Sequence, residues 1–237
     1  MDRISSNTNL FVMQTRRGCL QETMGCEAKT EFNISTNQDK NTHILYALEE
    51  SGCCIRTFCP NIRNWKMDVA VDKNSPAFLE IERPMRCGPV PLKCCCYQEV
   101  IAREKGGKEL GSIREEMFFC VPQFSILSAN GTKTGVIHQP TCVGGACVDC
   151  FAEGCYNCRI PFYIYNNEAD EVHDGKIVKV WTGLTSELFT DADNFELDFP
   201  AKADAATKAT LLGAVFLLNQ LFFEGTNDSG LLRNTTH

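Results

Sequence analysis

The side chains best suited to chemistry in this sequence are oxygen and sulfur ligands, and the first group is acidic. Between positions 191 and 198 the chain offers five oxygen-bearing side chains: Asp191, Asp193, Asn194, Glu196 and Asp198. Clustered carboxylate oxygens suit a hard cation such as calcium, and the segment begins like an EF-hand loop. It then departs from that pattern, because Phe195 and Glu196 replace a ligand and a glycine and Lys202 replaces the bidentate acid. The residues alone therefore favour an Asp/Asn turn leading into a strand. The alternative is a calcium site at these five residues, and we expect such a site to be weak.

Three consecutive cysteines, Cys94, Cys95 and Cys96, form the second group. Adjacent thiols cannot all bind one metal ion with a relaxed backbone, but they can be S-acylated where they lie near a membrane. Two or more acyl chains give stable anchoring where one does not. The alternative is a buried cluster, because a free cysteine packs like a small apolar side chain.

Two CxxC pairs, Cys147 with Cys150 and Cys155 with Cys158, form the third group. Four thiolates suit a structural zinc ion. Only four residues separate the two pairs, whereas a zinc ribbon usually has about 15–20 between them. Zinc is one prediction for these residues, and acylation or plain packing are the alternatives.

The composition excludes several classes of function. The 237 residues carry a net charge of −7 and no run of Lys or Arg, which argues against a nucleic-acid partner. No secretory signal is visible, so the fifteen cysteines are interpreted as reduced thiols, acylation sites or metal ligands rather than a disulfide framework. The sequence has no Gly-rich phosphate loop and no nucleophile elbow, and its four histidines are scattered. We therefore expect no bond-making catalysis.

Short alternating strands separated by turn residues make up most of the chain, as expected for a mainly β protein. Two sets of hairpins resemble each other, with offsets of 92 residues from Phe32 to Phe124 and 97 residues from Trp65 to Phe162. This indicates two pseudo-repeats, at about 28–117 and 118–200, although antiparallel strands also resemble one another by chance. Two such units closing into one antiparallel barrel would remove exposed strand edges and leave a lumen that must be filled.

The segment 201–224 is predicted to be the helix that fills this lumen. From Ala209 to Phe223 every residue is apolar or uncharged, and a helix without a polar face must be buried in a protein or in a bilayer. Fifteen residues cover roughly 22 Å, less than the ~30 Å hydrocarbon core, which favours burial over a transmembrane anchor. The residues expected to form its apolar surface are Leu211, Leu212, Val215, Phe216, Leu218 and Phe222.

Several stretches of the chain stand out as extended motifs: Gly175 to Gly183, Glu187 to Phe195, Phe199-Pro200 with the apolar helix that ends at Glu224, Glu82 to Cys87, and Cys94 to Glu99. Together they closely resemble the phospholipid scramblase family. The likeness runs from about Leu10 to Glu224. We accordingly expect a disordered N-terminus at 1–9, one domain at 10–225 and a flexible tail at 226–237.

That resemblance implies a tubby-like fold, a closed barrel of about twelve antiparallel strands around a buried C-terminal helix. It also implies calcium-dependent, ATP-independent movement of phospholipids between leaflets at the cytoplasmic face of the plasma membrane. Calcium would be held at 191–202, and Cys94 to Cys96 would be palmitoylated. The alternatives are an acylated membrane-binding module that moves no lipid, and a zinc-stabilised interaction protein.

Overall fold

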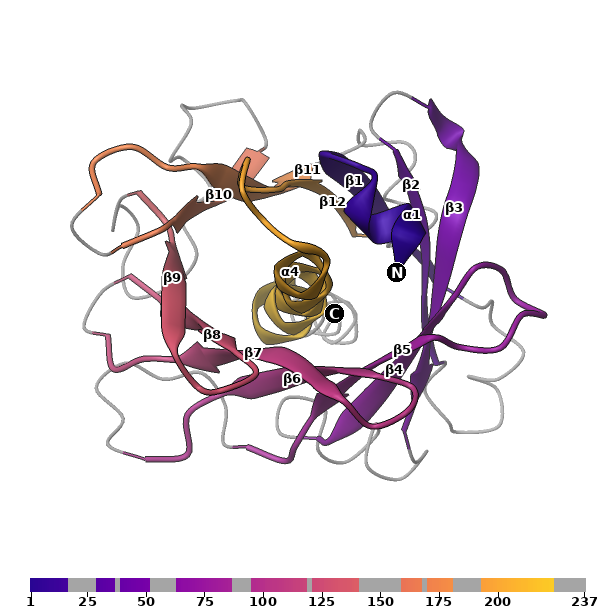
Figure 1. The fold of residues 1–237 in the computed structure, drawn as a ribbon, viewed down its shortest axis with the longest axis horizontal. Coiled ribbons are helices and arrows are strands. Elements are labelled where there is room, and N and C mark those ends of the chain that lie inside the picture. Colours follow the sequence, from indigo (N-terminus) through magenta and orange to yellow (C-terminus); the bar gives the residue numbers. More distant parts are fainter. Residues whose placement is uncertain are drawn as a thin grey trace, which may run out of the picture.

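Twelve antiparallel strands close into a barrel around one helix in the computed structural model of this chain (Figure 1). The structure describes residues 1–16, 29–36, 39–51, 63–86, 95–118, 121–140, 159–167, 170–180 and 193–223. Each strand pairs with its neighbours in sequence, and β1 pairs with β12 to close the barrel. The strands are β1 (Asn9–Arg16), β2 (Thr30–Thr36), β3 (Asp39–Glu50), β4 (Trp65–Ala70), β5 (Leu79–Arg83), β6 (Glu99–Glu104), β7 (Glu109–Glu115), β8 (Gln123–Ser128), β9 (Lys133–His138), β10 (Arg159–Tyr165), β11 (Gly175–Val180) and β12 (Asn194–Asp198).

The alternation of apolar residues explains which face of each strand lines the lumen. Successive side chains of a strand point to opposite faces, and in β2 the residues Phe32 and Ile34 are fully buried while Asn33 is partly exposed. In β12, Phe195 and Leu197 are likewise fully buried. The predicted closed antiparallel barrel of about twelve strands is confirmed.

The lumen is filled by α4 (Ala205–Leu218), which continues as a π-helical turn, η2 (Asn219–Phe223). The predicted start of this helix at residue 201 was wrong by four residues. Asp204 is the N-cap, and its carboxylate accepts a hydrogen bond of 2.8 Å from the backbone N–H of Thr207. A capping carboxylate satisfies an otherwise unpaired helix donor, so the helix begins where that side chain is available. The π-helical turn was not predicted.

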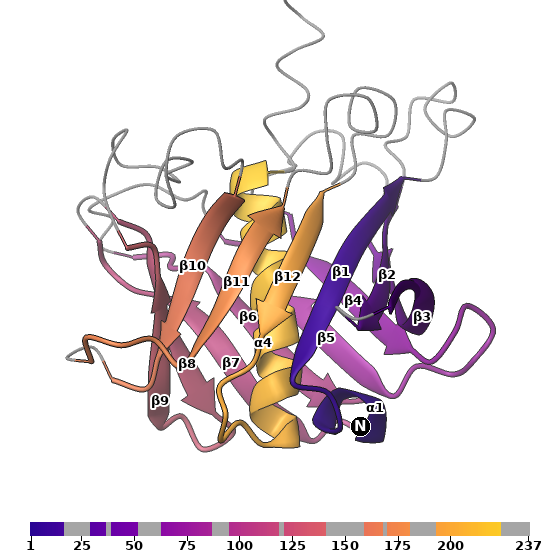
Figure 2. The same ribbon diagram turned by 90° about the horizontal axis from the view of Figure 1, so that it is seen from above.

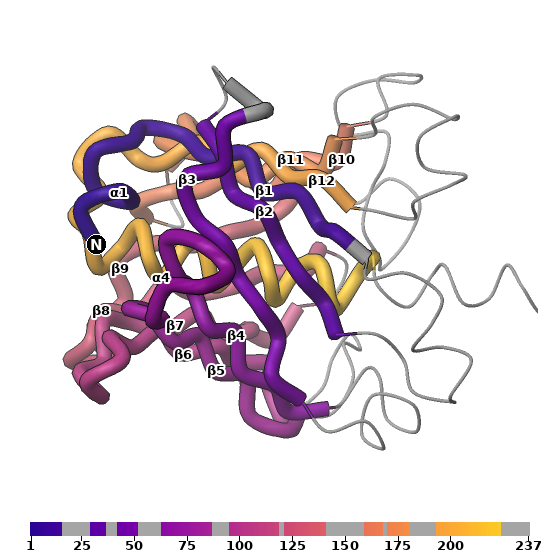
Figure 3. The backbone as a smooth tube through the Cα atoms, turned by 90° about the vertical axis from the view of Figure 1, so that its right-hand side faces the viewer, coloured from indigo at the N-terminus to yellow at the C-terminus, as the bar shows by residue number. Residues whose placement is uncertain are grey.

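The barrel wall surrounds α4 along its length, as the two side views show (Figures 2 and 3). Phe216 is 2% exposed, and its ring centroid lies 4.8 Å from that of Phe32 in β2. Phe222 stacks on Phe162 of β10 at 5.9 Å. Gly213 lies so close to the wall that an added Cβ would be 3.2 Å from Cγ2 of Ile81. The six residues expected on the helix surface all belong to the core or pack against it.

The helix is also long and apolar enough to cross a membrane by length and composition. Ala205–Phe223 contains 19 residues, about 28 Å of helix, which approaches the ~30 Å hydrocarbon core. Here 78% of its most apolar 18-residue window is buried inside the barrel. A core helix of a soluble protein passes the same composition test, and the prediction of a buried helix is confirmed.

The two ends of the barrel differ. The short helix α1 (Asp2–Ser5) lies beside the first turn of α4, and this end is called the α1 end (Figure 2). The other end is called the η2 end, because η2 is located there. At this end the odd-numbered strands end and the even-numbered strands begin. The structure differs here from the expected disorder of residues 1–9, because Ile4 is fully buried against the core. The predicted pseudo-repeats stay a prediction, and the predicted tail at 226–237 lies outside the described residues.

Candidate functional site

Buried polar side chains gather inside the η2 end of the barrel, and this group is called the polar collar. Its members occupy strand ends or the residues next to them, and each is at most 8% exposed: Gln14, Thr30, Glu49, Arg63, Arg83, Gln98, Glu115, Lys179 and Asp193. Buried polar groups must find hydrogen-bond partners to avoid a desolvation cost. The contacts among them therefore show what this end of the barrel is built to hold.

One half of the collar is a connected network that runs from β3 to β7. Arg63 Nε donates to Glu49 Oε1 at 3.2 Å, and Arg63 Nη2 donates to Glu49 Oε2 at 3.3 Å. Arg83 donates to the backbone carbonyl of Arg63 and, at 2.6 Å, to Gln98 Oε1. The backbone N–H of Gln98 donates to Glu115 Oε2 at 2.8 Å. Each of the two buried guanidinium groups thus finds acceptors on neighbouring segments, although Nε of Arg83 donates to no described residue.

The charge of Glu49 depends on this network. Burial raises the pKa of Glu49, but the Arg63 guanidinium and hydrogen bonds from Ser51, Arg63 and Thr30 outweigh burial and lower the pKa below its ordinary value. The carboxylate therefore stays ionised beside Arg63 at neutral pH. Because a buried ion pair is costly to break from one side, this pair holds the ends of β3 and β4 together.

The C-terminal end of the helix enters this polar layer. Trp65 donates its indole N–H to Gln220 Oε1. Asn219 is 2% exposed, and its Oδ1 has no hydrogen-bond partner in the described part of the chain. Beside it is a cavity of about 10 Å³, also lined by Glu49 and Arg63, which is close to the space of one water molecule. The two polar residues of η2 therefore match the polar layer of the wall.

The other half of the collar contains one of the predicted calcium ligands, Asp193. Asp193 Oδ1 lies 2.8 Å from Lys179 Nζ, and both side chains are more than nine-tenths buried. Lys179 Nζ also lies 4.4 Å from the centroid of the Phe223 ring. Gln14 completes this half, because its backbone N–H donates to the Asp193 carbonyl at 2.9 Å. One ammonium group thus joins a predicted calcium ligand to the end of the helix.

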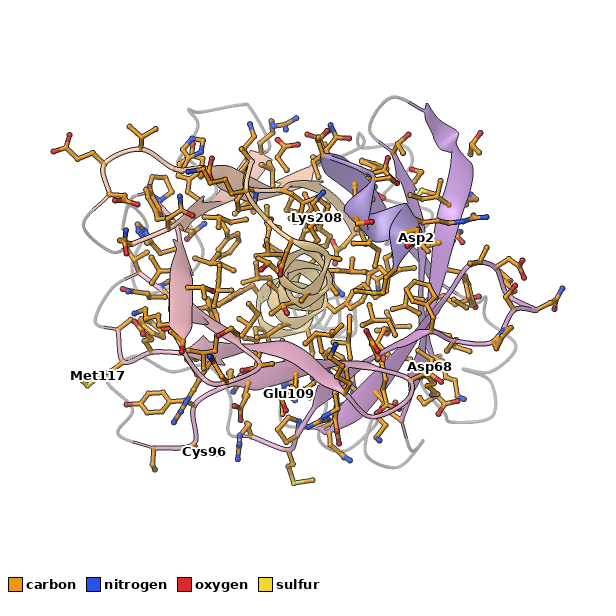
Figure 4. The ribbon with its side chains drawn as sticks, viewed as in Figure 1. Asp2, Asp68, Cys96, Glu109, Met117 and Lys208 are labelled. Carbon is orange, nitrogen blue, oxygen red and sulfur yellow. The ribbon has the colours of Figure 1, made fainter. Side chains whose placement is uncertain are left out.

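At the α1 end the helix is held by a single lysine. Lys208 Nζ donates to the backbone carbonyls of Ser5 at 2.8 Å and Asn7 at 2.7 Å (Figure 4). It also lies 5.2 Å from the centroid of the Phe199 ring. Lys208 is the one charged residue of α4, and its contacts fasten the first turns of the helix to the N-terminal segment. Polar contacts therefore fix α4 and η2 at both ends of the barrel.

Three other predicted calcium ligands lie on the outer face of β12. Asn194, Glu196 and Asp198 share the face opposite to Phe195 and Leu197. Glu196 Oε2 lies 2.5 Å from Arg159 Nη2, and Asp198 Oδ2 lies 4.0 Å from Lys176 Nζ. Asp191 lies outside the described residues.

Each described acid of this segment thus lies beside a cation, on β11 for Asp193 and Asp198 and on β10 for Glu196. Burial raises the pKa of Asp198, Lys176 and Arg159 lower it, and Glu196 raises it, with a net rise. Within the described ranges no group of three or more His, Cys, Asp or Glu side chains is arranged to hold a metal ion. Asp193 lies apart from the β12 acids, inside the collar. Calcium binding at 191–202 stays a prediction.

The predicted thiol sites are described only in part. Cys95 is exposed and Cys96 is half-buried at the start of β6. Cys96 has φ +60°, a left-handed conformation that is uncommon for a residue other than glycine. Cys94 lies outside the described residues, as do Cys147, Cys150, Cys155 and Cys158. Acylation and zinc binding stay predictions.

The polar collar was missed from the sequence, although a signal was present. Leu45, Ala47 and Glu49 alternate along β3, so Glu49 continues the inward-facing series. Leu79, Ile81 and Arg83 do the same along β5. A charged residue at the end of an inward-facing series is ordinarily interpreted as the start of a loop, which is why these residues were overlooked.

A closed β-barrel that encloses an apolar C-terminal helix defines the structural class of this protein. A family model described as Scramblase matches residues 1–225, so the chain belongs to the scramblase family and the resemblance seen in the sequence is confirmed. No solved structure matches the chain.

Curated relatives of this chain include three phospholipid scramblases. Phospholipid scramblase 2 of Bos taurus is 33% identical over 207 residues, covering 87% of this chain and 66% of that protein. Phospholipid scramblase 1 of Homo sapiens is 31% identical, covering 87% and 60%. Phospholipid scramblase family member 5 of Homo sapiens is 30% identical, covering 92% and 75%. The chain therefore spans less than two thirds of the length of the first two relatives.

Proposed function

We propose that this protein associates with phospholipid membranes and moves phospholipids between the two leaflets, in a calcium-dependent manner and without ATP. The observation that carries the proposal is the family match over residues 1–225, together with relatives that are named phospholipid scramblases. Such movement makes and breaks no covalent bond, in keeping with a sequence that offers no catalytic set. The cytoplasmic face of the plasma membrane is the proposed location.

The contacts of α4 suggest how calcium would act. The lumen is occupied by α4, so a lipid headgroup has no route through the barrel while the helix is in place. In the collar, a calcium ion would compete with Lys179 for the carboxylate of Asp193, because these two side chains are paired at 2.8 Å. Calcium bound by Asp193 and Asp191 would draw this carboxylate away from Lys179. The same ammonium lies over Phe223, so its release would loosen the hold on η2.

This arrangement makes weak calcium binding the physical expectation. A cation inside the collar must displace Lys179 from Asp193, and a cation on the outer face of β12 must displace Arg159 from Glu196 and Lys176 from Asp198, before it gains their oxygens. Replacing existing ion pairs lowers the net gain from each new ligand. Calcium affinity is therefore expected in the range of a low-affinity sensor rather than a buffer.

The test is lipid translocation by the purified protein in liposomes, with fluorescent phospholipid as the reporter and calcium titrated. The wild type is compared with Asp191→Ala/Asp193→Ala and with a control, Asp72→Ala, at an exposed acid in the β4–β5 turn. We expect calcium-dependent translocation that the double variant loses and the control keeps. Protein that inserts into or binds the liposomes but moves no lipid at any calcium concentration would refute direct scrambling.

A second candidate function is an acylated membrane-binding or regulatory module that moves no lipid. The observation that favours it is the filled lumen, together with the exposure of Cys95 next to Cys94 and Cys96. Mass spectrometry of protein from a eukaryotic host, before and after hydroxylamine treatment, tests it. Thioester-linked acyl chains on these cysteines, combined with no translocation in liposomes, would establish the module in place of the scramblase.

A further inference from the structure

Three neighbouring segments at the η2 end carry apolar side chains on the outside of the barrel. Met85 follows the end of β5, Cys95, Cys96 and Tyr97 precede β6, and Met117 follows the end of β7. These five residues are called the methionine rim. Arg86 at the end of β5 pairs with Glu99 of β6 at 2.9 Å, and the backbone N–H of Glu115 donates to the Gln98 carbonyl at 2.8 Å. The three segments therefore lie side by side.

The rim exposes large apolar side chains to water. Met85 is 55% exposed and Met117 is 65% exposed. In the part of the chain that the structure describes, one other large apolar residue is strongly exposed, Val172, which lies in the β10–β11 connection at the α1 end. Figure 4 shows Cys96 and Met117 projecting from the same side of the barrel, away from α4. Two exposed methionines and an exposed cysteine on adjacent segments thus concentrate apolar exposure at one end of the barrel.

A groove continues from the rim along the outer face of β7 and β8. It has a volume of about 430 Å³, and its lining includes Tyr97, Arg114, Met117, Leu127 and Lys133. It therefore combines apolar side chains from the rim and from β8 with two cationic residues, Arg114 and Lys133, and two acidic ones, Glu115 and Glu116.

Of the two cations in this groove, Lys133 has an ion-pair partner and Arg114 has none among the described residues. Lys133 is paired with Glu116 at 2.7 Å, and Glu99 is paired with Arg86. Glu115 is buried inside the collar, where it accepts from Gln98. Arg114 is exposed and makes no ion pair with any residue that the structure describes. The groove is therefore apolar at the rim, and on the adjoining wall it carries the exposed guanidinium of Arg114, whose cross-strand neighbour Glu99 is already paired with Arg86.

We infer that the methionine rim is the surface by which the barrel docks on a phospholipid bilayer, with Met85 and Met117 inserted between headgroups and Arg114 facing lipid phosphates. An apolar edge beside a cation matches the order of groups at a membrane interface, where acyl chains lie below phosphates. This inference rests on the proposed association with phospholipid membranes and names the surface that makes it. It places the η2 end, with the polar collar and the end of the helix, toward the bilayer.

The distribution of cysteines along the chain agrees with this orientation. All fifteen lie in segments that join strands at the η2 end, between β1 and β2, β3 and β4, β5 and β6, β7 and β8, and β9 and β10. No cysteine occurs in a strand, in α4 or in a connection at the α1 end. An acyl chain attached to Cys95 or Cys96 would tether the barrel by the same end as the rim.

The test is vesicle flotation with the full chain purified from bacteria, so that no acyl chain contributes to binding. Vesicles contain phosphatidylcholine alone or with a minor fraction of phosphatidylserine. The variants are Met85→Asp/Met117→Asp and Arg114→Gln, and the matched control is Val172→Asp, at the exposed apolar residue of the opposite end. Near-ultraviolet circular dichroism confirms that each variant is folded.

We expect the double methionine variant to lower the vesicle partition coefficient at least about tenfold, because two methionines no longer insert. Arg114→Gln lowers it about fivefold on vesicles with phosphatidylserine, and less at high salt. We expect the partition coefficient of Val172→Asp to stay within about twofold of the wild-type value. Equal binding by the double variant and the wild type, an equal loss in Val172→Asp, or no vesicle binding by the wild type would each overturn the inference. Equal binding would instead assign the rim to a protein partner.

Translocation measured on the same samples separates this inference from the proposed function. Wild-type protein that binds through the rim but moves no lipid supports the docking surface and refutes scrambling. Lipid movement that is equal in the wild type and in a double variant that still binds supports scrambling and refutes the docking surface.

Discussion

Replacing Phe216 by alanine should lower the free energy of unfolding by about 4 kcal/mol. Phe216 is 2% exposed and packs against Phe32 at a centroid distance of 4.8 Å. Truncation of a core phenylalanine costs about 3–5 kcal/mol, and the loss is greatest where the surroundings cannot collapse into the cavity. A hydrogen-bonded, closed barrel wall around α4 resists collapse from every side. For a chain of this size the melting temperature should fall by about 8–16 °C.

Urea unfolding followed by tryptophan fluorescence measures this change, because Trp65 is buried at the η2 end and reports on the helix through Gln220. Phe216→Leu keeps most of the apolar volume and should cost about 1–2 kcal/mol. Val172→Ala, at a residue that is 80% exposed, should change stability by less than about 0.5 kcal/mol. A cost below about 1 kcal/mol for Phe216→Ala would refute the burial of α4 in the barrel.

Three further substitutions test the contacts at the ends of the barrel. Lys208→Met removes both hydrogen bonds to the N-terminal segment, and we expect a loss of about 1–3 kcal/mol with faster amide exchange in residues 2–7. Glu49→Ala leaves the Arg63 guanidinium buried without its carboxylate, and should cost about 3–5 kcal/mol in urea unfolding. The pKa of Asp198 is raised, chiefly by burial, so wild-type stability should fall as pH rises from the ordinary value of 3.8 through the raised value. Asp198→Asn should lack that fall.

Each of these expectations has an outcome that contradicts it. Unchanged exchange in residues 2–7 of Lys208→Met would show that α1 is held without the lysine. A Glu49→Ala variant as stable as the wild type would show that Arg63 is solvated rather than buried. Between the unfolded and the folded pKa of Asp198, the folded state holds more protons than the unfolded state. The free energy of unfolding therefore decreases as pH rises through this range. Parallel stability curves of Asp198→Asn and the wild type across acid pH would show that this pKa is not raised.

The barrel and its central helix could be predicted because they depend on regular patterns. Alternating side chains mark half-buried strands, and a helix without a polar face can only be an interior element or a membrane span. The choice between the two rested on length, and the structure confirms burial through contacts such as that of Phe216 with Phe32. The start of α4 was misplaced because Ala201 and Ala203 have high helix propensity, whereas the helix begins only where the Asp204 carboxylate caps it.

The N-terminal segment and the polar collar could not be predicted by the same means. In β1, Leu10, Phe11 and Val12 are all buried, so the strand shows no alternation. The partners of Ser5 and Asn7 are distant in sequence, since both carbonyls accept from Lys208. Pairing such as that of Lys179 with Asp193 likewise depends on which strands become neighbours, which composition does not encode.

Amide hydrogen exchange of residues 209–218 in detergent-free buffer tests most directly whether α4 is the core of the barrel. We predict that these amides exchange only through global unfolding, at rates that match the stability measured in urea, in protein that remains monomeric without detergent. Exchange much faster than global unfolding, or aggregation that only detergent reverses, would contradict the barrel-filling helix. That result would assign 205–223 to a membrane span.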